Sequence, residues 1–156
     1  MNIALASSEL LLKESLFGLG VMFIAITFNV YIFAAIAMAY RNHLQKSSYL
    51  GKHLEIMRYA AYTMLLIIGM FISLTIWITA LNLFEVVVDW QKATLLTFSF
   101  FTSVGNFTVD LPFGWRLIPS LIAFSGLFSF AGATAIAMGM ARQLMNHLDQ
   151  HKAFDQ

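Results

Sequence analysis

Residues 93–110 read ATLLTFSFFTSVGNFTVD, and this stretch decides the fold that the sequence predicts. Its first part, residues 93–101, is apolar and has the length of a short amphipathic helix. The run without charge begins at residue 93 and ends at residue 109. This run is too short for a helix that crosses a bilayer, since about 20 apolar residues are needed. A short helix followed by Gly, Asn, Thr and Asp is typical of a re-entrant segment, whose exposed backbone must be covered by protein or by a water-filled cavity.

Three longer runs without Asp, Glu, Lys or Arg flank this stretch, at residues 15–40, 59–84 and 117–141. Each has about 25 residues and is long enough to span a membrane as a helix. Of the 156 residues, 60% are hydrophobic and 11% are charged, whereas about a quarter of a soluble domain is charged. The composition therefore excludes a water-soluble globule and predicts an all-α membrane protein with three transmembrane helices.

The charge pattern gives the expected topology. Six basic residues lie on the side of the first loop and the C-terminal tail, which places that side in the cytoplasm by the positive-inside rule: Arg41, Lys46, Lys52, Arg58, Arg142 and Lys152. The N-terminus is then expected outside the cell (inner) membrane. The chain divides into an outer N-terminal segment (1–14), a first transmembrane helix (15–40), a basic cytoplasmic loop (41–58), an outer pore-domain helix (59–84), a pore helix with filter and outer loop (85–116), an inner pore-lining helix (117–142) and a cytoplasmic tail (143–156).

Several function classes are excluded or disfavoured by residue content. The nine basic and eight acidic residues nearly cancel, so no basic surface for nucleic acid is expected. The chain has no cysteine, which excludes disulfides, thiolate metal sites and cysteine nucleophiles. No Asp, Glu, Lys, Arg or His lies inside the three runs to mark a proton relay, and no nucleophile has an adjacent base. An enzyme is therefore not expected, nor is a cofactor or a small-molecule substrate.

The sequence after the short helix resembles the selectivity filter of tetrameric cation channels related to potassium channels, which reads T-x-V-G-Y-G. Thr102, Val104 and Gly105 match this pattern, while Asn106 replaces the aromatic residue and Phe107 the second glycine. In small bacterial members of the ion-channel family, a Trp-Arg pair precedes the inner helix, as Trp115-Arg116 does here. The likeness covers roughly residues 72–144 and includes Ile76-Trp77 and Ala80-Leu81 in the outer helix.

The resemblance implies a homotetramer around a central pore, with bound potassium or sodium ions and no other metal or cofactor. Backbone carbonyls of the filter would replace the water shell of the ion. The implied ion-conducting filter is Thr102, Ser103, Val104, Gly105, Asn106 and Phe107, and the implied outer mouth contains Thr108 and Asp110.

The departures from the family pattern limit what is expected of this filter. Such a filter alternates in backbone handedness, and glycines supply left-handed positions. Gly105 keeps the first, but a positive φ at Phe107 would cost on the order of 1–2 kcal/mol. We therefore expect the inner carbonyl sites to survive, the outer ones to change, and selectivity for potassium over sodium to be weak. The outer side carries two more acidic than basic residues, which favours entry of monovalent cations.

Some features have two interpretations. The chain is either a conducting channel, or a non-conducting relative or accessory subunit of a membrane complex with the same fold. Gly126 and Gly132 indicate either a gating hinge or close helix packing. His147 and His151 share a helix face and predict either solvated side chains, which is the default, or a metal site. His43 and His53 are expected at the level of lipid headgroups, and Trp77, Trp90 and Trp115 are candidate interfacial anchors.

Overall fold

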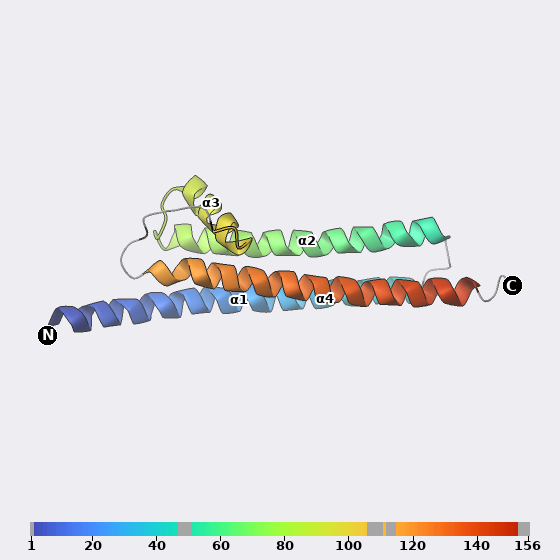
Figure 1. Ribbon diagram of the computed structural model, residues 1–156, viewed down its shortest axis with the longest axis horizontal. Helices are drawn as coiled ribbons and strands as arrows, with labels where there is room; N and C mark the ends of the chain where they lie inside the picture. The colour runs from blue at the N-terminus through green and yellow to red at the C-terminus, as the bar shows by residue number, and fades with distance from the viewer. Residues whose placement is uncertain (1, 47–50, 106–110, 112–114, 153–156) are drawn as a thin grey trace. The chain divides into compact units, whose positions relative to one another are not determined.

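The computed structural model is all-helical (Figure 1). It describes residues 2–46, 51–105, 111 and 115–152; of the side chains of 2–11, 13, 151 and 152 nothing is stated. The elements are α1 (Asn2–Lys46), α2 (Lys52–Leu83), α3 (Trp90–Phe101), the 3-10 helix η1 (Trp115–Leu117) and α4 (Ile118–Lys152). The described residues include no β-strand.

Three helical segments are long and apolar enough to cross a membrane: Glu14–Lys46, Lys52–Leu83 and Trp115–Gln150. They have 33, 32 and 36 residues. At 1.5 Å per residue each is longer than the hydrocarbon core of about 30 Å. The predicted all-α fold with three helices long and apolar enough to span a membrane is thereby confirmed.

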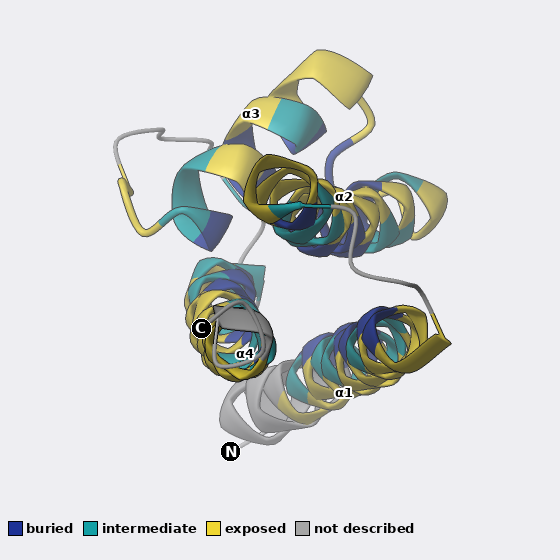
Figure 2. Ribbon diagram, turned by 90° about the vertical axis from the view of Figure 1, so that its right-hand side faces the viewer, coloured by how far each residue is buried: buried dark blue, intermediate teal, exposed yellow. Residues whose placement is uncertain are grey.

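The outward faces of the helices are apolar, as a membrane requires. Each long helix has buried residues along one side and exposed residues along the other (Figure 2). In α2 the buried side carries Leu66, Met70, Leu74, Trp77 and Leu81, spaced three or four residues apart. Large side chains on the exposed side are also hydrophobic, among them Met64, Ile68 and Phe71. In water, an apolar surface of this extent would promote aggregation, whereas hydrocarbon solvates it.

The chain divides into two compact units. The first comprises Met1–Phe28 with Phe71–Ser129, and the second comprises Asn29–Met70 with Phe130–Gln156. The first unit contains α3 and η1 and therefore the candidate pore segment.

In the first unit, α1 packs closely against the start of α4. A Cβ at Gly18 would lie 2.6 Å from Leu121 Cδ1 and 2.7 Å from Ile118 Cδ1, so glycine permits this approach. One residue earlier, the Phe17 ring contacts Phe84 at a centroid distance of 4.3 Å and Trp115 at 5.5 Å. Small residues at such positions let helices meet without the hydrophobic drive that water supplies.

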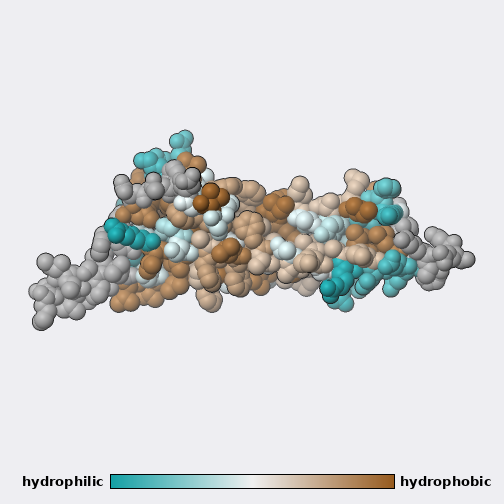
Figure 3. All heavy atoms as spheres, in the orientation of Figure 1, coloured by the Kyte–Doolittle hydropathy of each residue, from teal (hydrophilic) through white to brown (hydrophobic). Residues whose placement is uncertain are grey.

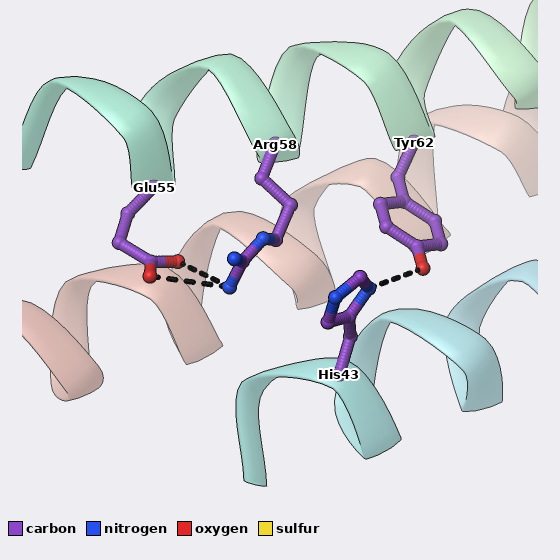
Figure 4. A network of polar contacts seen from close by, with 4 residues as sticks. All are labelled: His43, Glu55, Arg58 and Tyr62. Atoms are coloured by element: carbon purple, nitrogen blue, oxygen red, sulfur yellow. Dashed lines mark hydrogen bonds and ion pairs between the residues drawn. The ribbon is translucent and has the colours of Figure 1, made fainter. Parts of the chain in front are cut away.

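The second unit contains a cluster of polar and aromatic side chains where α1 ends and α2 begins (Figure 4). Glu55 is almost fully buried, and both of its carboxylate oxygens accept hydrogen bonds from Arg58, at 3.1 and 3.2 Å. His43 Nδ1 is hydrogen-bonded to the Tyr62 hydroxyl at 3.1 Å. The Tyr40 ring is buried beside Tyr62, with the ring centroids 5.3 Å apart. The acid and base of the expected basic loop thus neutralise each other within this cluster.

Hydrophilic residues of the second unit gather at the end where α1 and α4 end, next to a largely apolar surface (Figure 3). Both helices continue past the charge-free runs, α1 to Lys46 and α4 to Lys152. The tail that follows the third charge-free run therefore begins as an unbroken continuation of α4.

Candidate pore segment

The short helix α3 begins after a tight reversal of the chain. Glu85 has a φ of 54°, and the backbone N–H groups of Val86 and Val87 both donate to the carbonyl of Leu81, at 3.0 and 3.3 Å. The Asn82 side chain donates to the Val88 carbonyl at 3.0 Å. These bonds satisfy the backbone of a turn that buries both valines. They direct the chain from the end of α2 into α3.

Asp89 starts α3 as its N-cap. Its backbone is extended, with φ −79° and ψ 113°, and its carboxylate accepts a hydrogen bond from the N–H of Gln91 at 2.9 Å. A capping acid also interacts favourably with the positive end of the helix dipole. On its inner face α3 buries Ala93, Leu96, Thr97 and Phe101. The predicted helix over residues 93–101 is therefore present, and the cap extends its start to Trp90.

The loop after α3 folds back on the helix end. The N–H groups of Thr102, Ser103 and Gly105 donate to the carbonyls of Phe98, Phe100 and Ser99, at 3.1, 2.9 and 3.0 Å. The Thr102 hydroxyl also donates to the Phe98 carbonyl at 2.7 Å. The carbonyls of Phe98, Ser99 and Phe100 in the last turn of α3 are thus satisfied by the loop itself.

The backbone of this loop changes hand from residue to residue. Thr102 has a φ of −83°, Ser103 one of 60° and Gly105 one of 65°, while Val104 has no positive φ. The expected left-handed position at Gly105 is confirmed. Ser103 is a second one, and it costs on the order of 1 kcal/mol in a residue with a Cβ. Nothing in the sequence marked Ser103 as left-handed, because serine adopts this conformation only where its surroundings impose it.

Gly126 is the contact between α3 and α4. A Cβ placed on Gly126 would lie 2.0 Å from the Phe101 carbonyl oxygen and 3.0 Å from Phe101 Cα. Only glycine allows the backbone of the last α3 residue to approach α4 this closely. Of the two interpretations of Gly126, close helix packing is the one that an observed contact supports. The helix α4 is continuous through both Gly126 and Gly132.

A buried hydrogen bond joins α2 to α4 one residue before this contact. The Trp77 indole N–H donates to the Ser125 hydroxyl at 2.8 Å, and that hydroxyl donates to the Ile122 carbonyl at 2.8 Å. Both side chains are fully buried. Trp77 is therefore a core residue and not the interfacial anchor that was one interpretation of it. Trp90 is 53% exposed, in keeping with an interfacial position.

Asn106, Phe107, Thr108 and Asp110 lie outside the described residues. The described parts of the chain contain no group of three or more metal-ligating side chains.

Comparisons of this chain with protein families, with curated proteins and with solved structures give no match.

Proposed function

We propose that the chain is a cation channel that assembles as a homotetramer, with residues 102–107 as its ion-conducting filter. The observation that carries the proposal is the alternating backbone of residues 102–105, directly after a capped short helix and between two helices long enough to span a membrane. Backbone of alternating hand turns successive carbonyls toward the same side, which is the arrangement that coordinates an ion in a carbonyl-lined pore.

The hydrogen-bond accounting of the loop supports this proposal. Among the described residues, none donates to the carbonyls of Thr102, Ser103, Val104 or Gly105. These residues are exposed or half-exposed in the single chain, with Val104 at 70%. Carbonyls inside a membrane need partners, and ions, water and other copies of the chain are the partners that a pore provides.

One chain supplies one such loop, and four around an axis are needed to surround an ion. The apolar exposed faces of the helices leave surface for both lipid and neighbouring copies. The Phe101–Gly126 contact provides rigid support for the loop, because neither backbone moves there without displacing the other.

The ion preference follows from charge and from the filter sequence. The outer side has two more acidic than basic residues per chain, so four chains would form a negative mouth that concentrates cations. Phe107 replaces the second glycine of the family pattern, and for this reason we propose monovalent cations with weak selectivity for potassium over sodium.

The test is ion flux through the purified protein in lipid vesicles, together with its mass in nanodiscs. The proposal predicts a tetramer and a cation current whose reversal potential, in mixed potassium and sodium solutions, lies well short of the potassium Nernst value. A monomer or dimer as the only species would contradict the tetramer. A tetramer that passes no ion at any voltage or pH would favour the non-conducting relative.

The substitution Phe107→Gly is a further way to distinguish a conducting channel from a non-conducting relative. If the ring of Phe107 narrows the pore, glycine should raise conductance or potassium selectivity, because it removes a hydrophobic constriction and permits a positive φ. Asn106→Tyr is the control and should change less. The opposite ranking would place Phe107 outside the permeation path.

A further inference from the structure

A polar hollow lies between the last turns of α1 and α4, entirely within the second unit. Its volume is about 570 Å³. Its polar lining residues are Arg41 and Gln45 of α1 and Gln143, Asn146, His147 and Gln150 of α4. The two residues on α1 are four apart, and those on α4 lie at positions 143, 146, 147 and 150, so each helix presents one polar face to the hollow.

The positions of the lining residues along α1 and α4 correspond to the expected membrane surface. Arg41 is the first charged residue after the charge-free run of α1, and Arg142 is the first after that of α4. The lining residues of both helices lie at or just beyond these positions. Charged residues at the end of a spanning helix are found among the lipid headgroups.

The chemistry of the lining fits an anion. Arg41 is a permanent cation, the four carboxamides each offer two N–H donors, and none of the described lining residues is acidic. Where the structure describes the chain, Arg41 forms no ion pair, and the buried acid Glu55 is paired with Arg58 at 3.1 Å. Asp149 lines a different hollow, with Arg142. Lys46 lies in the last turn of α1, where it offsets the partial negative charge of the helix end.

We propose that this hollow binds the phosphate of an anionic membrane lipid. The guanidinium of Arg41 matches two phosphate oxygens in a forked arrangement, and the carboxamides donate to the others. Basic pockets between transmembrane helices are suited to such headgroups. The membrane level of the hollow favours a lipid over a soluble phosphate compound, and the proposal does not depend on ion conduction.

Native mass spectrometry of the full chain in detergent tests it, with phosphatidylglycerol as the anionic lipid and phosphatidylcholine of the same acyl chains as the comparison. Wild type should retain more phosphatidylglycerol. Arg41→Gln should weaken that binding about tenfold, because hydrogen bonds to a charged group are lost. Arg142→Gln is the matched control, since it removes the same charge from a neighbouring position outside the hollow, and it should weaken binding less than about threefold.

A second variant keeps the net charge constant. Gln143→Leu removes donors without removing charge and should weaken phosphatidylglycerol binding about threefold. Equal losses for Arg41→Gln and Arg142→Gln, no loss for Gln143→Leu, or no preference for the anionic lipid would each overturn the proposal. Displacement of the lipid by millimolar inorganic phosphate would assign the hollow to a soluble phosphate and overturn the lipid assignment. Circular dichroism of each variant verifies that the helices are retained.

Discussion

Gly126 and Gly132 are two glycines of the same helix, and their surroundings differ. A Cβ at Gly126 would lie 2.0 Å from a backbone oxygen of α3, whereas one at Gly132 would lie 3.5 Å from the ring of Phe33, an ordinary contact. Small residues in a transmembrane helix therefore do not share one role. Gly126 allows the candidate pore segment to pack against α4, whereas Gly132 leaves room for a methyl group.

The largest expected effect comes from Gly126→Ala. The methyl group would overlap the Phe101 backbone, which a side-chain rotation cannot relieve, so we expect a loss of about 3 kcal/mol in the free energy of unfolding. Gly132→Ala should change it by less than about 1 kcal/mol, because the gain in helix propensity offsets the tighter contact. Thermal unfolding in detergent measures both. Equal losses would show that the contrast between the two glycines is wrong.

Trp77→Phe and Tyr59→Phe compare two hydrogen bonds between α2 and α4, one in each unit. In the first unit, the Trp77–Ser125 bond is buried at 2.8 Å, so its loss together with the lost volume should cost about 2 kcal/mol. In the second unit, Tyr59 donates to the Ala137 carbonyl at 3.4 Å in a part-buried position, and Tyr59→Phe should cost about 0.5 kcal/mol or less. Chemical denaturation of both variants tests the ranking. A larger effect of Tyr59→Phe would reverse it.

Gly105→Ala tests a glycine that is required by conformation and not by space. Among the described residues, no atom lies within 4 Å of a Cβ at this position, but its φ is 65°. We expect a loss of about 1 kcal/mol from the left-handed alanine and, if the loop conducts, a reduced cation flux. Ser103→Gly should have the opposite effect on stability, since it relieves a similar conformation. A gain in stability for Gly105→Ala would indicate that the alternating backbone is not kept in the membrane.

Gly139→Ala has a small expected effect, and it is the one glycine substitution here that should raise stability. No atom of the described part of the chain lies within 4 Å of a Cβ at this helical glycine, so alanine should stabilise the protein by about 0.5–1 kcal/mol through helix propensity alone. A rise in the midpoint of thermal unfolding checks this expectation. A fall would contradict the expectation that Gly139 has open space for a methyl group.

The helices could be predicted from the sequence because the relevant signals are local. A run of about 25 residues without charge is long enough to cross a bilayer whatever its neighbours are. The short helix before Thr102 was likewise predicted, and only its start differs, because Asp89 caps it. The position of Gly105 with a positive φ could also be predicted, since glycine is the residue that adopts it without strain.

The partners of the buried side chains could not be predicted in the same way. Trp77 and Ser125 are far apart in the sequence, and a tryptophan near a helix end fits an interfacial anchor as well as a core position. Gly126 fitted both a hinge and a packing contact for the same reason. The polar hollow lined by Arg41 and His147 could not be predicted from any local sequence pattern, because its two sides come from helices at opposite ends of the chain.

The sequence by itself determined that this protein is helical and suited to a membrane, because the cost of placing charge in hydrocarbon acts on every residue of a span separately. The tertiary structure decided that Gly126 is the glycine against which α3 packs and that Trp77 is buried. It also decided that Ser103 is left-handed and that Arg41 lies across a hollow from Gln143. These depend on distances between residues remote in the chain, and close packing settles such distances only once the helices have met.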